Sequence, residues 1–222
     1  MNTNFIVKMR IESFHIATVV VLCIFLIVYR IFRCLPADEE ESLMITKSTI
    51  KTLIFFGSGG HTMEMIRLIK EMDAKLYSPV CFTIGHTDVT SIDKVRSAHV
   101  ALEKHASWLR VFRNREVKQS WFTTIFTSIW SLIQAFIVIF RYKPQLLICN
   151  GPGTCLSLCY SAFLLNVIGW TETRIVFVES FCRVKSLSLT GKLLLPIANK
   201  FIVQWPELHN VSPKAKFIGT LC

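Results

Sequence analysis

Charged residues are scarce in this chain. They make up 18% of its 222 residues, against about 25% in an ordinary soluble domain, while hydrophobic residues reach 52%. This composition excludes a disordered tail, a collagen-like repeat and a charged coiled coil. Acidic residues are the scarcest charged type, 15 against 25 lysines and arginines, so the net charge is +10. Such a balance indicates an anionic partner, and the apolar excess favours a membrane surface or a phosphorylated substrate over nucleic acid.

The chain also lacks the spacings that are typical of metal and disulfide sites. None of its eight cysteines forms a CxxC pair, and a chain of this length needs no disulfides to hold a core, so reduced thiols in a cytosol-facing protein are predicted. Four histidines show no metal-ligand spacing either: His86, His99, His105 and His209. We therefore expect no metal site. Basic residues alternate with aromatic ones only within residues 108–122, so nucleic acid is not an expected partner.

The long apolar run near the N-terminus is predicted to be a membrane anchor. Phe14–Phe32 is rich in Val, Ile and Leu, and Ile16–Tyr29 contains no charge. About 20 residues are needed to cross the hydrocarbon, and His15 and Arg30 can extend this shorter run by snorkelling at its ends. A secretory signal peptide is the alternative, but no small-residue cleavage site follows the run.

Four segments follow from this pattern. Residues 1–13 form a short N-terminal segment, 14–33 the transmembrane anchor, 34–49 an acidic polar linker without periodicity, and 50–222 the folded domain. Basic residues flank the anchor on both sides and leave its orientation open. The unpaired cysteines favour a cytosolic C-terminal domain.

The domain alternates short apolar strands with glycine-containing turns and helices. Continuous rather than alternating apolar strands are typical of a parallel sheet that helices cover on both faces. The fold class predicted is therefore α/β, with a Rossmann-like parallel sheet after an N-terminal transmembrane helix. The expected strands are residues 51–56, 79–84, 108–112, 145–149, 174–178, 201–204 and 216–219, and the clearest helices begin near residues 62 and 155.

A second apolar stretch, residues 121–140, contains no charge in 20 residues. Polar or small side chains recur along it at spacings of three and four, which gives one helical face a polar stripe. Three readings stay open: a crossover helix packed on the core, an amphipathic helix in the membrane headgroup region beside a basic cluster, and a second span. A span is the least favoured, because it would cut the α/β domain in two.

The first loop with chemical potential is Gly57-Ser58-Gly59-Gly60-His61, between a strand and a helix. Glycines let a backbone approach a phosphate, and the free N–H groups of a helix N-terminus attract anions. The loop is no Walker A motif, and a nicotinamide fingerprint is broken because Thr62 stands at the third glycine position. His61 is either a hydrogen-bonding residue at the helix start or a neutral imidazole that acts as a general base.

The second loop, Asn150–Thr154, includes Gly151, Gly153 and Thr154 and again joins a strand to a helix. Ligands of open α/β sheets bind beyond the C-terminal strand ends, so both loops are expected on one rim. Glu179 follows a further strand at that rim. Its carboxylate is expected to bind a sugar hydroxyl or accept a proton, or else to pair with Arg183.

Four motifs together resemble a known family, the membrane-anchoring subunit of the endoplasmic-reticulum UDP-N-acetylglucosamine transferase. The resemblance covers the chain from about Thr52 to its C-terminus, with the motifs in the same order. The domain is also distantly similar to the N-terminal half of MurG-type glycosyltransferases of the GT-B fold. The motifs are GSGGHTMEMIRL (57–68), ICNGPGTC (148–155), IVFVESFCRVKSLSLTGK (175–192) and FIVQWPEL (201–208).

The resemblance implies the second step of dolichol-linked oligosaccharide assembly on the cytosolic face of the endoplasmic reticulum, with the nuclear membrane as a second location. N-acetylglucosamine would pass from its UDP ester to dolichyl-pyrophosphate-N-acetylglucosamine in a β1,4 linkage, with inversion and without a cofactor. His61 and Glu179 are then the candidate catalytic residues. The acceptor pyrophosphate and sugar would be bound by Gly57, Ser58, Gly59, Gly60, Gly151, Gly153 and Thr154.

The resemblance also implies a partner. A two-lobed enzyme needs a second α/β domain, roughly another 150 residues by ordinary domain size, and this chain ends just after its last expected strand. A soluble sugar-nucleotide-binding subunit would supply that lobe in a heterodimer, docking near Phe217–Cys222, and this chain would be inactive alone. Two alternatives stay open: a non-catalytic scaffold that recruits a soluble enzyme to the membrane, and, less favoured, a membrane-tethered oxidoreductase that uses a nicotinamide cofactor.

Overall fold

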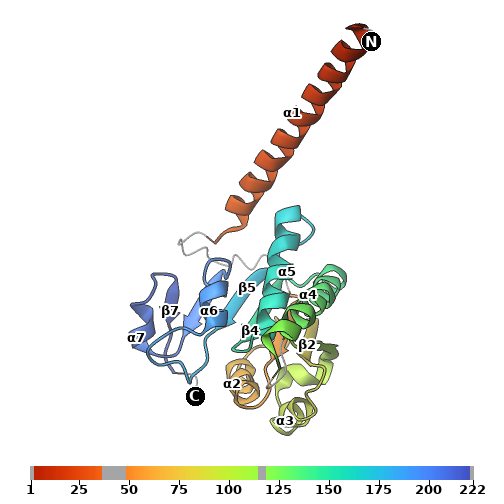
Figure 1. Ribbon diagram of the computed structural model, residues 1–222. Coiled ribbons are helices and arrows are strands. Elements are labelled where there is room, and N and C mark those ends of the chain that lie inside the picture. Colours follow the sequence, from red (N-terminus) through yellow and green to blue (C-terminus); the bar gives the residue numbers. More distant parts are fainter. Residues whose placement is uncertain (1–2, 37–48, 115–118, 221–222) are drawn as a thin grey trace.

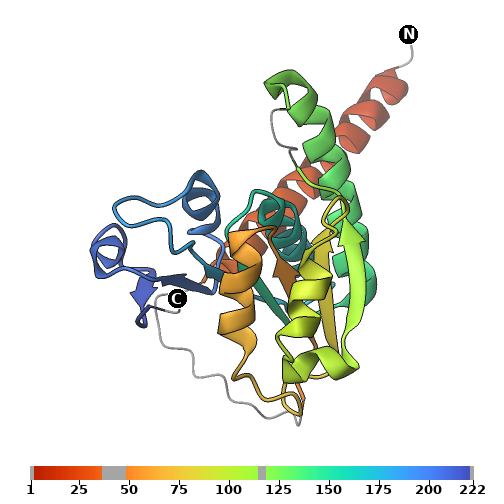
Figure 2. The same ribbon diagram turned by 90° about the horizontal axis from the view of Figure 1, so that it is seen from below.

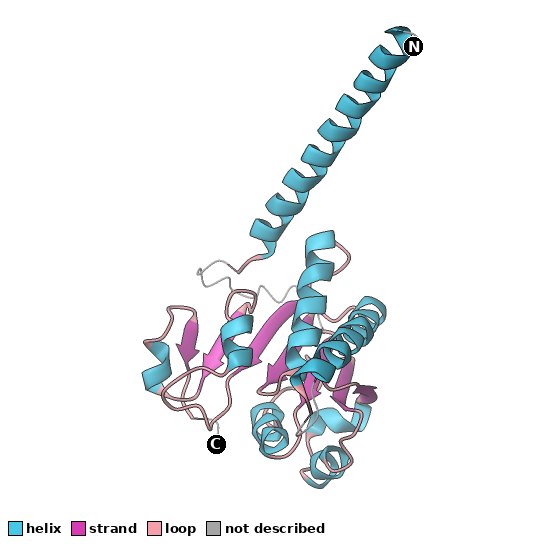
Figure 3. Cartoon of the chain, in the orientation of Figure 1, coloured by secondary structure: helices cyan, strands magenta, loops and turns pink. Residues whose placement is uncertain are grey.

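A computed structural model describes residues 3–36, 49–114 and 119–220. Within these residues seven parallel strands form one sheet in the order β3-β2-β1-β4-β5-β6-β7 (Figures 1 and 3). The Rossmann-like parallel sheet is confirmed, and all seven expected strands are present within one or two residues of their predicted ends. The strands are β1 (Thr52–Phe56), β2 (Val80–Gly85), β3 (Ser107–Val111), β4 (Leu146–Asn150), β5 (Arg174–Val178), β6 (Lys200–Val203) and β7 (Ala215–Phe217).

The helices include the four that the sequence predicts, α1, α2, α4 and α5, and several short ones that it does not. The additional helices have seven residues or fewer, too short to show a hydrophobic period. The helices are α1 (Thr3–Cys34), α2 (Gly60–Ile69), α3 (Ser91–Ser97), the 3₁₀ helix η1 (Ala101–His105), α4 (Trp121–Tyr142), α5 (Thr154–Ile168), α6 (Leu189–Leu194) and α7 (Pro206–His209).

The two faces of the sheet carry separate cores. Because successive side chains of a strand point to opposite faces, Leu53 and Phe55 of β1 pack into one core with α4, α5 and α6. Ile54 and Phe56 pack into the other core with α2, α3 and η1. Figure 2 shows α2 and α3 in front of the sheet and α4 and α5 behind it. Helices on both faces, as predicted, explain why the central strands are apolar throughout.

Helix α1 projects away from the sheet (Figure 1) and contacts the domain at its C-terminal end. Arg30 donates hydrogen bonds from Nε to the Val167 carbonyl (3.0 Å) and from Nη2 to the Asn166 carbonyl (2.8 Å). These carbonyls lie at the end of α5, where the helix itself offers no further N–H donor. Arg30 therefore ties the anchor to α5. Most of the predicted linker, residues 37–48, lies outside the described residues.

Helix α4 uses its polar stripe to hold the loop that precedes it. Ser131 Oγ donates to the Phe112 carbonyl (2.8 Å), Gln134 Oε1 accepts from the Phe112 N–H (2.9 Å), and Thr127 Oγ1 donates to the Asn114 carbonyl (2.8 Å). The neighbouring face packs on α5, with Ala135 and Ile139 buried. The remaining face is apolar and exposed, with Phe122, Ile125, Phe126, Ile129, Trp130, Ile133 and Ile137.

Within the described residues, two helices are long and apolar enough to cross a membrane by length and composition, Phe14–Cys34 within α1 and Phe122–Tyr142 within α4. A core helix would have its apolar side chains covered, and most of those on α4 are not. The crossover-helix reading thus accounts for only one side of α4. Its other apolar side is not covered by the described residues.

Candidate active site

The two glycine-containing loops lie together on one rim of the sheet, as the strand order requires. β1 and β4 are parallel neighbours, with Thr52 opposite Leu146, so the loops that follow them emerge side by side at the C-terminal edge. From β1 the chain adds β2 and β3 on one side of the sheet and then β4 to β7 on the other. The topological switch point therefore lies between β1 and β4, which is where open α/β sheets form their binding crevice. The predicted common rim is confirmed.

The His61 side chain joins the two loops. A Cβ added at Gly151, whose φ is +75°, would lie 2.3 Å from ring atoms of His61. A Cβ at Gly57 would lie 2.7 Å from the His61 Cβ and 2.8 Å from the Pro152 ring. Both glycines are therefore required by packing around His61. A side chain at position 151 would displace the imidazole ring, and one at position 57 would collide with the His61 Cβ and the Pro152 ring.

His61 is not a capping residue of α2. The N-cap position is Gly59, with no side-chain cap hydrogen bond. The imidazole Nδ1 is buried and has no hydrogen-bond partner, whereas the side chain as a whole is 31% exposed. The ring thus turns its Nδ1 inward and keeps another part of its surface accessible. The helix-start reading thus lacks a capping hydrogen bond, and the general-base reading stays a prediction.

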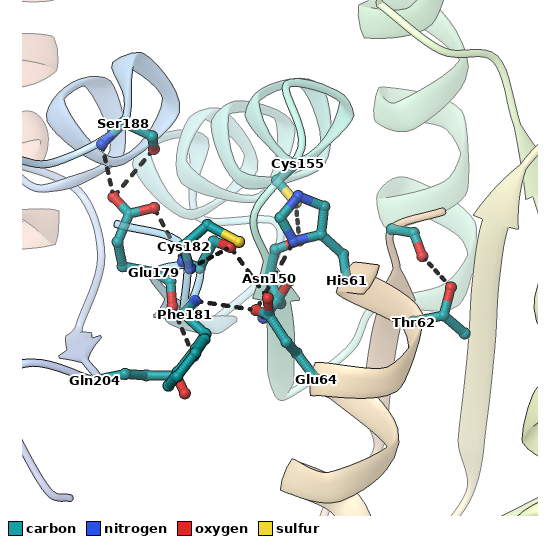
Figure 4. A network of polar contacts seen from close by, with 12 residues as sticks. His61, Thr62, Glu64, Asn150, Cys155, Glu179, Phe181, Cys182, Ser188 and Gln204 are labelled. Carbon is teal, nitrogen blue, oxygen red and sulfur yellow. Dashed lines mark hydrogen bonds and ion pairs between the residues drawn. The ribbon is translucent and has the colours of Figure 1, made fainter. Parts of the chain in front are cut away.

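Glu64 lies beneath His61, one turn further along α2 (Figure 4). Its Oε2 is 3.8 Å from the His61 Nδ1 and accepts a hydrogen bond from Asn150 Nδ2 (2.7 Å). Its Oε1 accepts from Ser180 Oγ (3.1 Å). Burial would raise the pKa of the Glu64 carboxyl, but the polar groups around it, first among them the His61 imidazole, outweigh this effect and hold the pKa below its ordinary value. The carboxylate therefore stays ionised although it is buried.

Nothing in the sequence pattern singles out Glu64 as a functional residue. Its only signal is the spacing His61-x-x-Glu64, which puts both side chains on one face of the first turns of α2. Its other partners come from the ends of β4 and β5 and become visible only once the strands are in place.

Glu179 is on the rim, as predicted, but its side chain is fully buried. Oε2 accepts from the backbone N–H (2.9 Å) and the hydroxyl (3.0 Å) of Ser188, and Oε1 accepts from the Ser180 N–H (3.0 Å). The predicted alternative, a pair with Arg183, is not what these contacts show. A Cβ at Gly191 would lie 2.2 Å from Oε2, so the carboxylate fits against a bare backbone. Figure 4 shows it turned away from His61, toward Ser188.

The exposed parts of the two loops are their tips. Ser58, Gly59 and Gly60 are exposed before α2, and Gly153 is exposed before α5. These tips present backbone N–H groups at two helix N-termini, an arrangement that favours anions. Thr154 is 6% exposed and lies behind the tip of the second loop. Among the seven predicted binding residues, these four tip residues are thus the ones open to a ligand.

Thr62 closes the first loop from inside. Its hydroxyl donates to the Gly57 carbonyl and lies 2.7 Å from the Ser91 hydroxyl, which in turn donates to Asp88 (2.6 Å). All of these groups are buried. The threonine that breaks the nicotinamide fingerprint is therefore a structural part of this loop, because its hydroxyl bonds where a glycine offers no side chain.

Within the described residues, no three His, Cys, Asp or Glu side chains come together to hold a metal ion. Cys149 on β4 and Cys155 and Cys159 on α5 are buried in the core, and burial raises the pKa of each thiol. The cysteines of the described residues are free thiols. The polar chemistry of the rim therefore comes from His61, the two carboxylates and the loop backbone.

Curated relatives match the chain over most of its length. The UDP-N-acetylglucosamine transferase subunit ALG14 of Rattus norvegicus is 39% identical over 210 residues, which cover 90% of this chain and 94% of the relative. The subunit of the same name from Homo sapiens is also 39% identical over 210 residues, with the same coverage. That of Schizosaccharomyces pombe is 46% identical over 171 residues, which cover 75% of this chain and 81% of the relative.

Among solved structures, the crystal structure of Acinetobacter baumannii MurG matches with a TM-score of 0.52 at 12% sequence identity. The match covers 77% of this chain and 45% of the MurG chain, so this chain spans less than half of that protein. The likeness shows the fold, a lobe of the GT-B type. The family described as "Oligosaccharide biosynthesis protein Alg14 like" matches residues 52–221, the whole of the α/β domain. The chain belongs to the Alg14 family.

Proposed function

We propose that this chain is the membrane-anchored, acceptor-binding subunit of a two-subunit UDP-N-acetylglucosamine transferase. One observation carries the proposal. Two glycine loops with exposed tips meet around a single accessible imidazole on the rim of a GT-B-type lobe, in a chain of the Alg14 family. Its relatives are named as UDP-N-acetylglucosamine transferase subunits. From this name we take the donor, UDP-N-acetylglucosamine, and the need for another subunit.

In the proposed reaction, the 4-hydroxyl of dolichyl-pyrophosphate-N-acetylglucosamine attacks the anomeric carbon of the donor. A β1,4 bond forms with inversion, the bond to UDP breaks, and the hydroxyl proton moves to a base on the enzyme. The loop tips, Ser58 to Gly60 and Gly153, would hold the acceptor pyrophosphate through their N–H groups. Gly57, Gly151 and Thr154 would act from behind, by shaping the loops.

His61 is the better placed of the two candidate bases. Its imidazole is partly exposed beside both loop tips. The Glu179 carboxylate is fully buried, and both of its oxygens already accept hydrogen bonds. We therefore assign proton transfer to His61. Glu179 holds the loop between β5 and α6 through Ser188.

Membrane attachment would use two elements of the chain. α1 is proposed to span the endoplasmic-reticulum membrane once, with the C-terminal domain in the cytosol. The exposed apolar face of α4 is proposed to lie in the headgroup region. At the end of α4, Phe140 stacks on Trp170 (4.5 Å between ring centroids) and Lys143 lies 3.7 Å from the Trp170 ring. An aromatic pair beside a cation is typical of a membrane interface.

The donor-binding lobe would belong to a soluble partner. MurG, which has this lobe within a longer chain, is covered to 45% by the match. We propose that the partner docks at the lateral edge of the sheet that β7, its outermost strand, forms. Phe217 and Ile218 are exposed there. Residues 221–222 of the predicted docking segment lie outside the described residues. The chain would be inactive without that partner.

The deciding experiment co-expresses this chain with its soluble subunit and assays membranes for transfer from UDP-N-acetylglucosamine to dolichyl-pyrophosphate-N-acetylglucosamine. We expect no activity from the chain alone, activity from the pair, and a loss of about 10²- to 10⁴-fold with His61→Ala, the range that a general base contributes. His105→Ala, at an exposed position of η1, is the matched control and should be neutral.

Other outcomes of this assay point elsewhere. Wild-type turnover from a folded His61→Ala pair, together with wild-type turnover from Glu179→Ala, would remove the catalytic assignment. It would leave a scaffold that recruits a soluble enzyme to the membrane. No transfer at all from the correctly inserted pair would contradict the transferase itself.

A further inference from the structure

Glu64 faces the nitrogen of His61 that the proposed reaction does not use. The Nδ1 atom is buried, has no hydrogen-bond partner and lies 3.8 Å from the Glu64 Oε2. Nδ1 is the nitrogen of this ring that is buried without a partner, and 31% of the side chain is exposed, so we infer that the accessible part of the ring includes its other nitrogen, Nε2. Proton transfer with an acceptor hydroxyl therefore falls to Nε2, which must carry a lone pair to act as a base.

The carboxylate decides which tautomer the neutral ring adopts. If the proton is on Nδ1, the N–H dipole points at a negative charge. If the proton is on Nε2, a buried lone pair on Nδ1 faces that same charge without any donor nearby. At 3.8 Å the two atoms are not hydrogen-bonded, but in a buried place the attraction between the carboxylate charge and the N–H dipole favours the first arrangement. The preferred tautomer is the one that leaves Nε2 free to accept a proton.

The carboxylate itself is held rigidly. Glu64 is 8% exposed, and its hydrogen bonds come from Asn150 Nδ2, Ser180 Oγ and the Phe181 N–H (3.4 Å). These donors sit at the ends of β4 and β5, whereas Glu64 belongs to α2. The charge is thus fixed relative to the second loop as well as to the first. Gly151 limits the ring from the other side.

We propose that Glu64 is the positioning residue of the site: it sets His61 in the Nδ1–H tautomer and stabilises the imidazolium that forms when Nε2 takes the acceptor proton. The inference rests on the proposed function, because it gives His61 the part of a base. Glu64 does not touch the acceptor and acts only through the ring. Its role resembles that of the buried carboxylate in other catalytic pairs in which a carboxylate orients a histidine.

The first test is spectroscopic and does not depend on activity. The full chain in detergent micelles is labelled with ¹⁵N-histidine, and the His61 signals are assigned by their loss in His61→Gln. At about pH 8, where histidine side chains are mostly neutral, we expect the chemical shifts of a protonated Nδ1 and an unprotonated Nε2. In Glu64→Met, which removes the acceptor at similar volume, we expect a mixture of tautomers. A His61 ring protonated on Nε2 in the wild type would overturn the inference.

The second test is kinetic and uses the assembled pair. We expect kcat to fall by about 10²-fold in Glu64→Met, the lower end of what a general base contributes. We expect an intermediate fall in Glu64→Gln, which keeps an acceptor oxygen but loses the charge. The KM for the acceptor should change little in either. Glu71→Gln, an exposed carboxylate just beyond α2, is the matched control and should leave both constants unchanged.

These outcomes separate the inference from the function beneath it. Full activity in His61→Ala would remove the base from the proposed function, while the spectrum would still judge the pairing of Glu64 with His61. An inactive His61→Ala together with a Glu64→Gln pair at wild-type kcat would overturn the positioning role alone. If Glu64→Met does not fold, the isosteric Gln variant and the wild-type spectrum carry the test.

Discussion

The apolar segments of helices α1 and α4 are alike in length, and the two helices differ in what their side chains contact. The apolar segment of each has 21 residues and is apolar enough to cross a membrane. The apolar side chains of α1 from Phe14 to Tyr29 are exposed around the helix, and the domain contacts the helix near its C-terminal end, where Arg30 bonds to α5. α4 packs on α5 along one side, bonds a loop along another and exposes its apolar side chains on the third.

The difference shows that a few polar side chains matter more than mean hydropathy. Ser131 and Gln134 satisfy both backbone groups of Phe112, in a loop with no regular secondary structure. Irregular backbone is not tolerated in lipid-exposed hydrocarbon, since its polar groups have no water there. A span at α4 would carry this loop into the bilayer. If α4 lies in the membrane interface instead, the loop at Phe112 stays in water and the apolar face of α4 contacts lipid.

The strongest test of the comparison is the topology of α4. Single cysteines are placed at its two ends, as Ser120→Cys and Arg141→Cys, in a chain whose other exposed cysteines are serines. We expect a membrane-impermeant maleimide to label both from the same side, in an all-or-none manner. Labelling of the two positions from opposite sides would show that α4 crosses the membrane, as α1 is proposed to do.

A charge placed in each helix should separate them further. Ile24→Arg lies in the exposed apolar part of α1, where an arginine at the centre of a span costs about 2.5–3.5 kcal/mol. We expect a shift of about 100-fold against insertion, measured as loss of the carbonate-resistant fraction. Ile129→Arg in α4 should leave that fraction unchanged, because α1 still holds the chain. Equal losses from both substitutions would contradict the comparison.

The polar stripe of α4 should contribute to folding stability. Ser131 is 1% exposed, and Ser131→Ala removes its part-buried hydrogen bond to the Phe112 carbonyl. We expect the free energy of unfolding to fall by about 0.5–1.5 kcal/mol, the net contribution of an ordinary hydrogen bond, measured by denaturant titration in detergent. Thr123→Ala, an exposed site bonded only within its own helix, should change it by less than about 0.5 kcal/mol. Similar losses of unfolding free energy in Ser131→Ala and Thr123→Ala would mean that the polar stripe does not stabilise the fold.

The smallest effect is expected at the tie between α1 and α5. Arg30→Ala removes two hydrogen bonds to carbonyls that water can also reach, so the loss should be near the low end for such bonds, about 0.5 kcal/mol. Hydrogen exchange of amides near the end of α5, around Gly169, should become faster while the rest of the domain is unchanged. No change in exchange would mean that α1 is not tied to the domain at this point.

The strands and the rim were predictable because they depend on local signals. Apolar runs between glycine turns indicate parallel strands, and a parallel sheet brings the turns after β1 and β4 to one edge. Glu64 was not predictable in the same way, since it stands on an ordinary amphipathic helix and its partners Asn150 and Ser180 are about 90 and 120 residues away. Glu179 lies at the rim where the sequence predicted it. Its complete burial depends on the packing of Gly191, which no periodicity reveals.

The helices illustrate the same limit. The spacing of polar residues in 121–140 predicted a stripe, and the stripe is there. Its partner could not be read from the sequence, because the groups that it bonds are backbone carbonyls and N–H groups, which every residue has. The catalytic and binding roles of the loop residues stay predictions, to be tested as described above.

The contact between Gly151 and His61 also limits how sequences of this fold can vary. The imidazole fills the space where a side chain at position 151 would begin. The two positions therefore cannot change one at a time: a chain with alanine at 151 must have a smaller residue at 61 or a displaced ring. Related chains that keep the histidine should keep glycine at 151, and those that lose one should lose the constraint on the other.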